Sequence, residues 1–165
     1  MNEVDALQLA LATLHQSVYA YGLAGARLRG GFARGLALRR LDEERRRRDR
    51  LTVLVERAGV TPTPAAPGYQ PPQPVNDQAE ALQLLATVET AASGAAWELV
   101  ASTRANSPAR REGVRWLENA AVTEQTWAAL AAQKSTAEPE PVTGPAFPGQ
   151  PAASQPSTTP TSSPS

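Results

Sequence analysis

The 165-residue sequence contains no cysteine, a single histidine and no net charge. Without cysteine the chain cannot form disulfides, thiolate nucleophiles or zinc-thiolate sites, and its redox compartment is left open. The 16 basic and 16 acidic side chains cancel, so the chain lacks the overall positive charge of a general nucleic-acid-binding protein. These absences exclude several classes of site before any motif is considered.

Long apolar runs are also missing. No run approaches the roughly 20 residues that a membrane span requires. The N-terminal stretch MNEVDALQLALATL carries acids where a signal peptide needs Lys or Arg, and Gln8 interrupts its apolar residues. We therefore expect a cytoplasmic protein with no membrane contact.

The most highly charged stretch, RRLDEERRRRDR over Arg39–Arg50, mixes both signs. Its acids and bases alternate at three- and four-residue spacing, which is typical of a solvated, ion-paired helix face. A surface for RNA or DNA would instead present an excess of one sign. We expect no nucleic-acid partner.

Two proline-rich stretches divide the chain, at 59–75 and 135–165. Proline lacks the amide proton of a helix interior, so the first stretch is predicted to be a connector. The second is rich in Pro, Ser and Thr and has almost no large apolar side chain, so burial cannot offset its ordering entropy. The sequence thus predicts one domain over 1–134 and a disordered tail over 135–165.

Two segments before the connector and two after it carry apolar residues at three- and four-residue steps, the period of an amphipathic helix. The first covers about 2–28, and the second follows a turn near 29–35 and ends at about 58. The third runs from 76 or 77 to about 104, and the fourth begins at 107–108. Helix starts are indicated by three cap candidates: Asn2, Asn76 or Asp77, and Ser107 followed by proline. Gly30 and Gly31 separate the first two helices, and Gly59 is placed to end the second.

The length of the connector favours one topology. The loop between the third and fourth helices has only a few residues, so those helices must be antiparallel neighbours. The 17 residues from Gly59 to Val75 can span well over roughly 30 Å, enough to travel the length of a bundle. The sequence predicts an all-α, four-helix bundle with a long crossover between helices two and three, which is the ferritin-like arrangement.

Several runs resemble a known family: LHQSVYAYGLAGARL, RRRRDRL, GVTPTPAAPGYQPPQPVND, Glu89 within ATVETAA, and WLENAAVTEQTW. Together they are similar to DUF4439, a family of uncharacterised ferritin-like proteins of actinobacteria, over about residues 3–133. The resemblance implies a ferritin-like fold. That fold often holds a di-iron centre, with a Glu from each of two helices and a Glu-x-x-His pair from each of the other two.

Helical phase predicts one layer of polar residues at mid-height in the bundle. If the first two helices form one hairpin and the last two form another, the midpoints of all four helices lie at the same level of the bundle. Polar side chains occur on or near the inward face of each helix at that level. The predicted layer consists of His15, Glu44, Arg48, Glu89 and Glu124.

This layer is a poor candidate for a metal centre. The weak candidates for iron or manganese ligands are His15, Glu44, Glu89 and Glu124. No Glu-x-x-His pair can exist because Ala12 lies three residues before the only histidine, and the fixed charge of Arg48 competes with a metal for carboxylates. We expect Arg48 to pair with Glu89 or Glu124 as a buried ion pair.

Two functions remain open. The first is a non-catalytic interaction or structural protein without a cofactor, and the second is a vestigial metal-binding oxidoreductase or iron-handling protein using iron or manganese. Tryptophans at 97, 116 and 127 are predicted to lie in the core or in a dimer interface, so we expect a homodimer with a further, unidentified protein partner. Gly22, Gly25 and Gly94 are expected to permit close helix approach.

Overall fold

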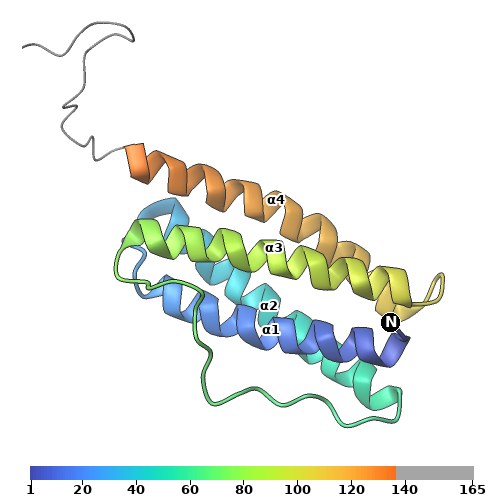
Figure 1. The fold of residues 1–165 in the computed structure, drawn as a ribbon. Helices are drawn as coiled ribbons and strands as arrows, with labels where there is room; N and C mark the ends of the chain where they lie inside the picture. The colour runs from blue at the N-terminus through green and yellow to red at the C-terminus, as the bar shows by residue number, and fades with distance from the viewer. Residues whose placement is uncertain (137–165) are drawn as a thin grey trace, which may run out of the picture.

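The computed structural model describes residues 1–136 as a bundle of four helices (Figure 1). The helices are α1 (Glu3–Gly25), α2 (Gly31–Arg57), α3 (Gln78–Ser102) and α4 (Pro108–Thr136). Where the sequence predicted a definite helix boundary, the observed one lies within three residues of it, and the all-α class is confirmed. Of the predicted tail, the first two residues extend α4, and 137–165 lie outside the described residues.

Side-chain caps explain where three helices begin. Asn2 Oδ1 accepts from the Asp5 amide at 2.8 Å, and Ser107 Oγ accepts from the Arg110 amide at 3.0 Å. At α3 the cap is Asp77, whose Oδ1 accepts from the Glu80 amide at 2.8 Å. Each bond satisfies an amide that has no partner within its own helix.

Glycines with positive φ end or separate helices at the predicted positions. Gly30 and Gly31 have φ of 48° and 65° in the turn between α1 and α2, and Gly59 has φ of 80° just after α2. Residues with a side chain rarely adopt this left-handed region, so glycine allows these sharp changes of direction.

The connector between α2 and α3 runs along α1 from its start to its end (Figure 1). Two side chains of α1 hold it by hydrogen bonds, Gln8 Nε2 to the Thr61 carbonyl at 2.7 Å and His15 Nε2 to the Thr63 carbonyl at 3.0 Å. Just after the end of α1, Arg27 Nε donates to the Val75 carbonyl at 3.1 Å. Since α3 therefore begins beside the end of α1, α3 is antiparallel to α1 and parallel to α2. The long crossover predicted from the connector's length is observed.

Packing between the helices is uneven. Helix α3 packs extensively against α4 and α1, and α1 against α2, but α2 has few contacts with α4. The close approach of α3 and α4 depends on Gly113, where an added Cβ would lie 2.9 Å from Val100 Cγ2. Gly22, Gly25 and Gly94 have no such neighbour within 4 Å, so the prediction that they permit close approach was wrong. Their lack of a side chain relieves no contact between helices.

The core consists of two apolar clusters, one toward each end of the bundle. Trp116 belongs to one cluster and Trp127 to the other, and both are fully buried, whereas Trp97 is 60% exposed on α3. Along α2 and α3 the residues between the two clusters include buried charges. Within residues 1–136, no helix combines the length and apolar character that a bilayer span requires.

Candidate functional site

A buried arginine joins two buried glutamates in the middle of the bundle. Arg40 Nη2 on α2 lies 3.1 and 3.2 Å from the two carboxylate oxygens of Glu89 on α3. The same nitrogen lies 3.3 Å from Glu44 Oε1, one turn further along α2. Glu44 and Glu89 are each 1% exposed and Arg40 is 4% exposed. Buried charges must be paired in this way because their desolvation is costly.

Two aromatic side chains complete this layer from the remaining helices. The Tyr21 hydroxyl on α1 donates to Glu89 Oε1, and Trp127 Nε1 on α4 donates to the Tyr21 hydroxyl at 2.9 Å. Both rings are buried, with at most 1% of their surface exposed. All four helices therefore contribute a polar atom to one hydrogen-bonded layer, which fixes how the two hairpins meet.

The layer continues toward α4 through a second buried arginine. Arg47 Nη1 lies 2.5 Å from Glu44 Oε1, and Arg47 Nε lies 3.3 Å from Glu112 Oε1 on α4. The guanidinium also lies 5.6 Å from the ring centroid of Trp116, within cation–π range. Arg50 then holds Glu112 with two hydrogen bonds of 3.0 and 2.7 Å. Ion pairs thus extend from the centre of the bundle to its α2–α4 surface.

The structure brings together two of the five predicted site residues, Glu44 and Glu89. Arg48 instead binds its neighbour Asp49 at 2.7 Å, with 31% of its side chain exposed. Arg40 and Arg47 provide the cations of the layer because they share a helical face with Ala37, Leu51 and Val55. Arg48 is rotated by about 100° from Arg47. Reading the alternate three- and four-residue steps backward from Leu51 would have found both arginines.

His15 and Glu124 also lie outside the layer. His15 is half-buried and binds the connector at Thr63. Glu124 is half-buried on α4, and the buried residue beside it is Thr123, whose hydroxyl donates to the Asn119 carbonyl at 2.7 Å. The α4 contribution to the layer comes from Trp127 because the indole reaches Tyr21 across the bundle.

Burial and neighbouring charges shift the acid–base properties of the layer. Burial raises the pKa of Glu44 to about 7, although Arg47 and Arg40 oppose the shift. Burial also raises the pKa of Glu89 against the effect of Arg40 and Tyr21. Burial and the Glu89 charge raise the pKa of Tyr21, so the phenol stays protonated. Burial disfavours the Arg40 cation, but Glu89 and Glu44 raise its pKa overall.

The donor set does not fit the di-iron centre that the family resemblance implies. The Arg40 guanidinium is bonded to both central carboxylates, so a fixed cation already lies between them. The only histidine binds a backbone carbonyl of the connector. Among residues 1–136, no three His, Cys, Asp or Glu side chains are grouped so that they could hold a metal ion.

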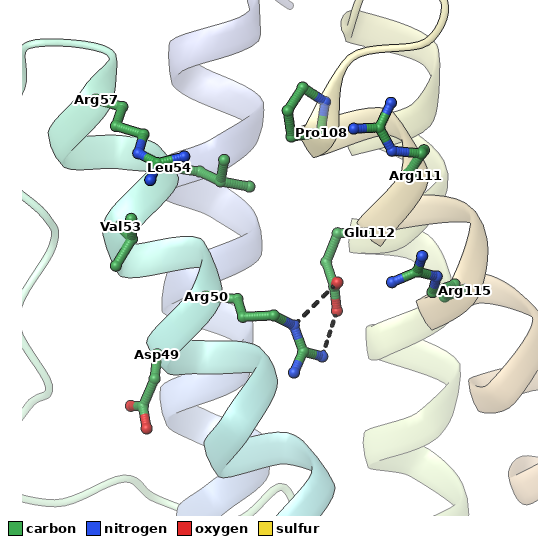
Figure 2. A pocket seen from close by; sticks show the side chains of 9 residues that line it. All are labelled: Asp49, Arg50, Val53, Leu54, Arg57, Pro108, Arg111, Glu112 and Arg115. Atoms are coloured by element: carbon green, nitrogen blue, oxygen red, sulfur yellow. Dashed lines mark hydrogen bonds and ion pairs between the residues drawn. The ribbon is translucent and has the colours of Figure 1, made fainter.

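A groove of about 590 Å³ opens between the second half of α2 and the first turns of α4, where these helices diverge (Figure 2). The Arg50–Glu112 pair crosses it. Its lining residues are Asp49, Arg50, Val53, Leu54, Arg57, Pro108, Arg111, Glu112 and Arg115.

Comparison with known proteins gives a family and a structural relative. The model of a family described as Domain of unknown function (DUF4439) matches residues 6–152. A similar solved structure is that of a conserved hypothetical protein, rv2844, from Mycobacterium tuberculosis, at 30% sequence identity and a TM-score of 0.73. The match covers 78% of this chain and 96% of that chain. No curated protein matches the sequence.

Proposed function

Given that this chain belongs to the DUF4439 family, we propose that it is a ferritin-like, non-catalytic binding protein in which an arginine–carboxylate layer replaces a di-iron centre. The observation that carries the proposal is the position of Arg40, bonded to Glu44 and Glu89 at the centre of the bundle. A guanidinium there provides the positive charge that these carboxylates would otherwise take from a metal.

The topology supports the ferritin-like assignment. Two antiparallel hairpins are joined by a crossover that travels the length of α1, and such a long connection distinguishes ferritin-like bundles from up-and-down bundles. The polar layer lies between two apolar clusters. Mid-height side chains of all four helices are where ferritin-like proteins place their metal ligands.

The burial of the layer supports a structural role for it. Tyr21, Glu44 and Glu89 are each 1% exposed, so a substrate could reach them only if the helices separated. A general acid or base must lie within hydrogen-bond reach of its substrate. Binding would therefore occur on the outer surface, where the α2–α4 groove is available.

Metal analysis tests this proposal. The full chain would be exposed to Fe(II) in air, or to Mn(II), desalted, and its metal content measured by mass spectrometry. We expect far less than one ion per chain for the unmodified protein. One or more tightly bound ions per chain would overturn the proposal in favour of an iron- or manganese-dependent oxidoreductase or an iron-handling protein.

An Arg40→Leu variant sharpens the test, with Arg34→Leu as its control. Arg34 is exposed in the first turns of the same helix, so its loss should leave the layer intact. If the carboxylates form a degenerate metal site, removal of Arg40 should raise metal affinity because a competing cation is lost. We expect no gain of stoichiometric metal in either variant.

Self-association is a further part of the proposal. Trp97 is 60% exposed on α3, and tryptophan is enriched at protein interfaces. We propose a homodimer that buries this side chain and leaves another surface for a protein partner. Light scattering across a wide concentration range tests it: the unmodified chain should be dimeric and Trp97→Gln more readily monomeric. The cytoplasmic location stays a prediction.

A further inference from the structure

The α2–α4 groove is lined by three exposed arginines that lie outside the ion pairs described above. Figure 2 shows Arg57 on α2, and Arg111 and Arg115 on α4, extending toward the space between the two helices. All three are exposed. None of them forms an ion pair with another residue in the described part of the chain.

The two acids of the groove are already paired with other arginines. Asp49 accepts hydrogen bonds of 2.9 and 2.7 Å from Arg48, and Glu112 accepts two from Arg50. The residues that line the groove include four arginines and these two acids, which leaves an excess of two positive charges. Among residues 1–136, Arg111 donates its side-chain hydrogen bond only to the backbone carbonyl of Asn106, which orients its guanidinium without neutralising it.

The walls of the groove are partly apolar. Val53 is 42% exposed there, and Leu54 and Pro108 line the same space. A volume of about 590 Å³ is within the range of small-molecule sites, which combine apolar walls with a few placed polar groups. A groove of this size suits a small organic anion better than a folded partner.

We propose that the α2–α4 groove binds a small organic molecule bearing two or more phosphate groups. Arg57, Arg111 and Arg115 bind the phosphates, since planar guanidinium groups bind phosphate oxygens in pairs. The organic portion packs against Val53 and Leu54. The α4 N-terminus contributes little, because Ser107 already caps the Arg110 amide.

This inference rests on the proposed binding function and names its ligand class. The ion pair between Arg50 and Glu112 favours anion binding, because Arg50 offsets the negative charge of Glu112 next to the phosphates. Arg47 holds the same carboxylate from inside the bundle at 3.3 Å. The buried layer thus supports one wall of the groove.

Calorimetric titration of the full chain with ADP and with pyrophosphate tests the inference. We expect saturable binding of one ADP per chain that weakens as salt rises, because charge attraction is screened. Arg57→Gln, Arg111→Gln and Arg115→Gln should each weaken ADP binding about tenfold, the loss expected for one charge-assisted contact. Arg34→Gln, an exposed control on α2, should change it less than about twofold.

Several outcomes would overturn the inference. These are an ADP Kd weaker than about 1 mM at low salt, equal loss in Arg34→Gln and the groove variants, or citrate binding as tightly as pyrophosphate. Tighter binding of a short RNA than of ADP would indicate a macromolecular ligand instead. The metal analysis and the ADP titration are independent measurements. Stoichiometric iron would refute the proposed function without changing the ADP result. An absence of ADP binding would refute the ligand class without changing the metal result.

Discussion

Arg40 on α2 and Glu89 on α3 face each other at 3.1 Å in the centre of the bundle, 49 positions apart in the sequence. They join the first hairpin to the second, and neither is accessible to solvent beyond 4% of its surface. The pair is therefore the point at which the stability of the fold and the proposed replacement of a metal centre can be tested together.

Removing one member of this pair should be costly. Arg40→Leu should lower the free energy of unfolding by about 3 to 5 kcal/mol, because buried Glu89 loses its cation and buried Glu44 keeps only Arg47. The double variant Arg40→Leu with Glu89→Met should recover most of that loss, since Arg47 still pairs with Glu44 and the desolvation cost of the other two charges disappears. Urea unfolding monitored by circular dichroism measures each value.

Arg48→Leu is the matched control for Arg40→Leu. Its partner Asp49 is exposed, so the change should alter stability by less than about 0.5 kcal/mol. A loss at Arg48 as large as that at Arg40 would contradict the assignment of Arg40 as the central cation.

Stability should increase as the pH falls from neutral. Burial raises the pKa of Glu44 from 4.5 to about 7, so between these values the folded protein holds a proton that the unfolded chain releases. The free energy of unfolding therefore falls as pH rises through this window. We expect a gain of up to about 2 kcal/mol on going from about pH 8 to about pH 5.5, measured by urea unfolding.

Glu44→Gln should flatten that profile, because glutamine cannot release a proton. Glu89 acts in the same direction because its pKa is also raised by burial. Glu112 acts oppositely: although burial opposes it, Arg50 lowers its pKa below 4.5, so its contribution is lost only in stronger acid. A stability maximum above pH 8 would contradict the assignment of Glu44.

Gly113→Ala should destabilise the contact between α3 and α4. The new Cβ would lie 2.9 Å from Val100 Cγ2 and 3.3 Å from the Ala96 carbonyl oxygen, and overpacking of this kind costs about 1 to 3 kcal/mol. Gly94→Ala, where nothing lies within 4 Å, should be neutral or stabilise by up to about 1 kcal/mol. The Tm of Gly113→Ala should fall, and that of Gly94→Ala should stay the same or rise.

His15→Ala should loosen the connector from α1. The hydrogen bond from His15 to the Thr63 carbonyl is lost, so amide exchange and proteolysis around Thr63 should become faster, with a global loss of about 1 kcal/mol. Gln16→Ala, at an exposed neighbouring position, is the control. Unchanged protection of the connector in His15→Ala would refute this role.

Sequence periodicity predicted which segments are helical and that Glu44 and Glu89 face inward, because burial repeats along each helix with a fixed period. It assigned the wrong arginine on α2, since a run of four arginines offers charged residues to every face. The predicted layer also omitted Tyr21, whose hydroxyl joins the observed one.

The sequence by itself determined the helices, their caps, the glycine turns and the long crossover, because these depend on residues close together in the chain. Only the tertiary structure decided that Arg40 lies between Glu44 and Glu89, that Trp127 reaches Tyr21, and that His15 holds the connector. The α2–α4 groove likewise depends on how far the two hairpins diverge. Such relations are set by the packing of distant helices, in which a shift of one residue along a helix turns a side chain by about 100°.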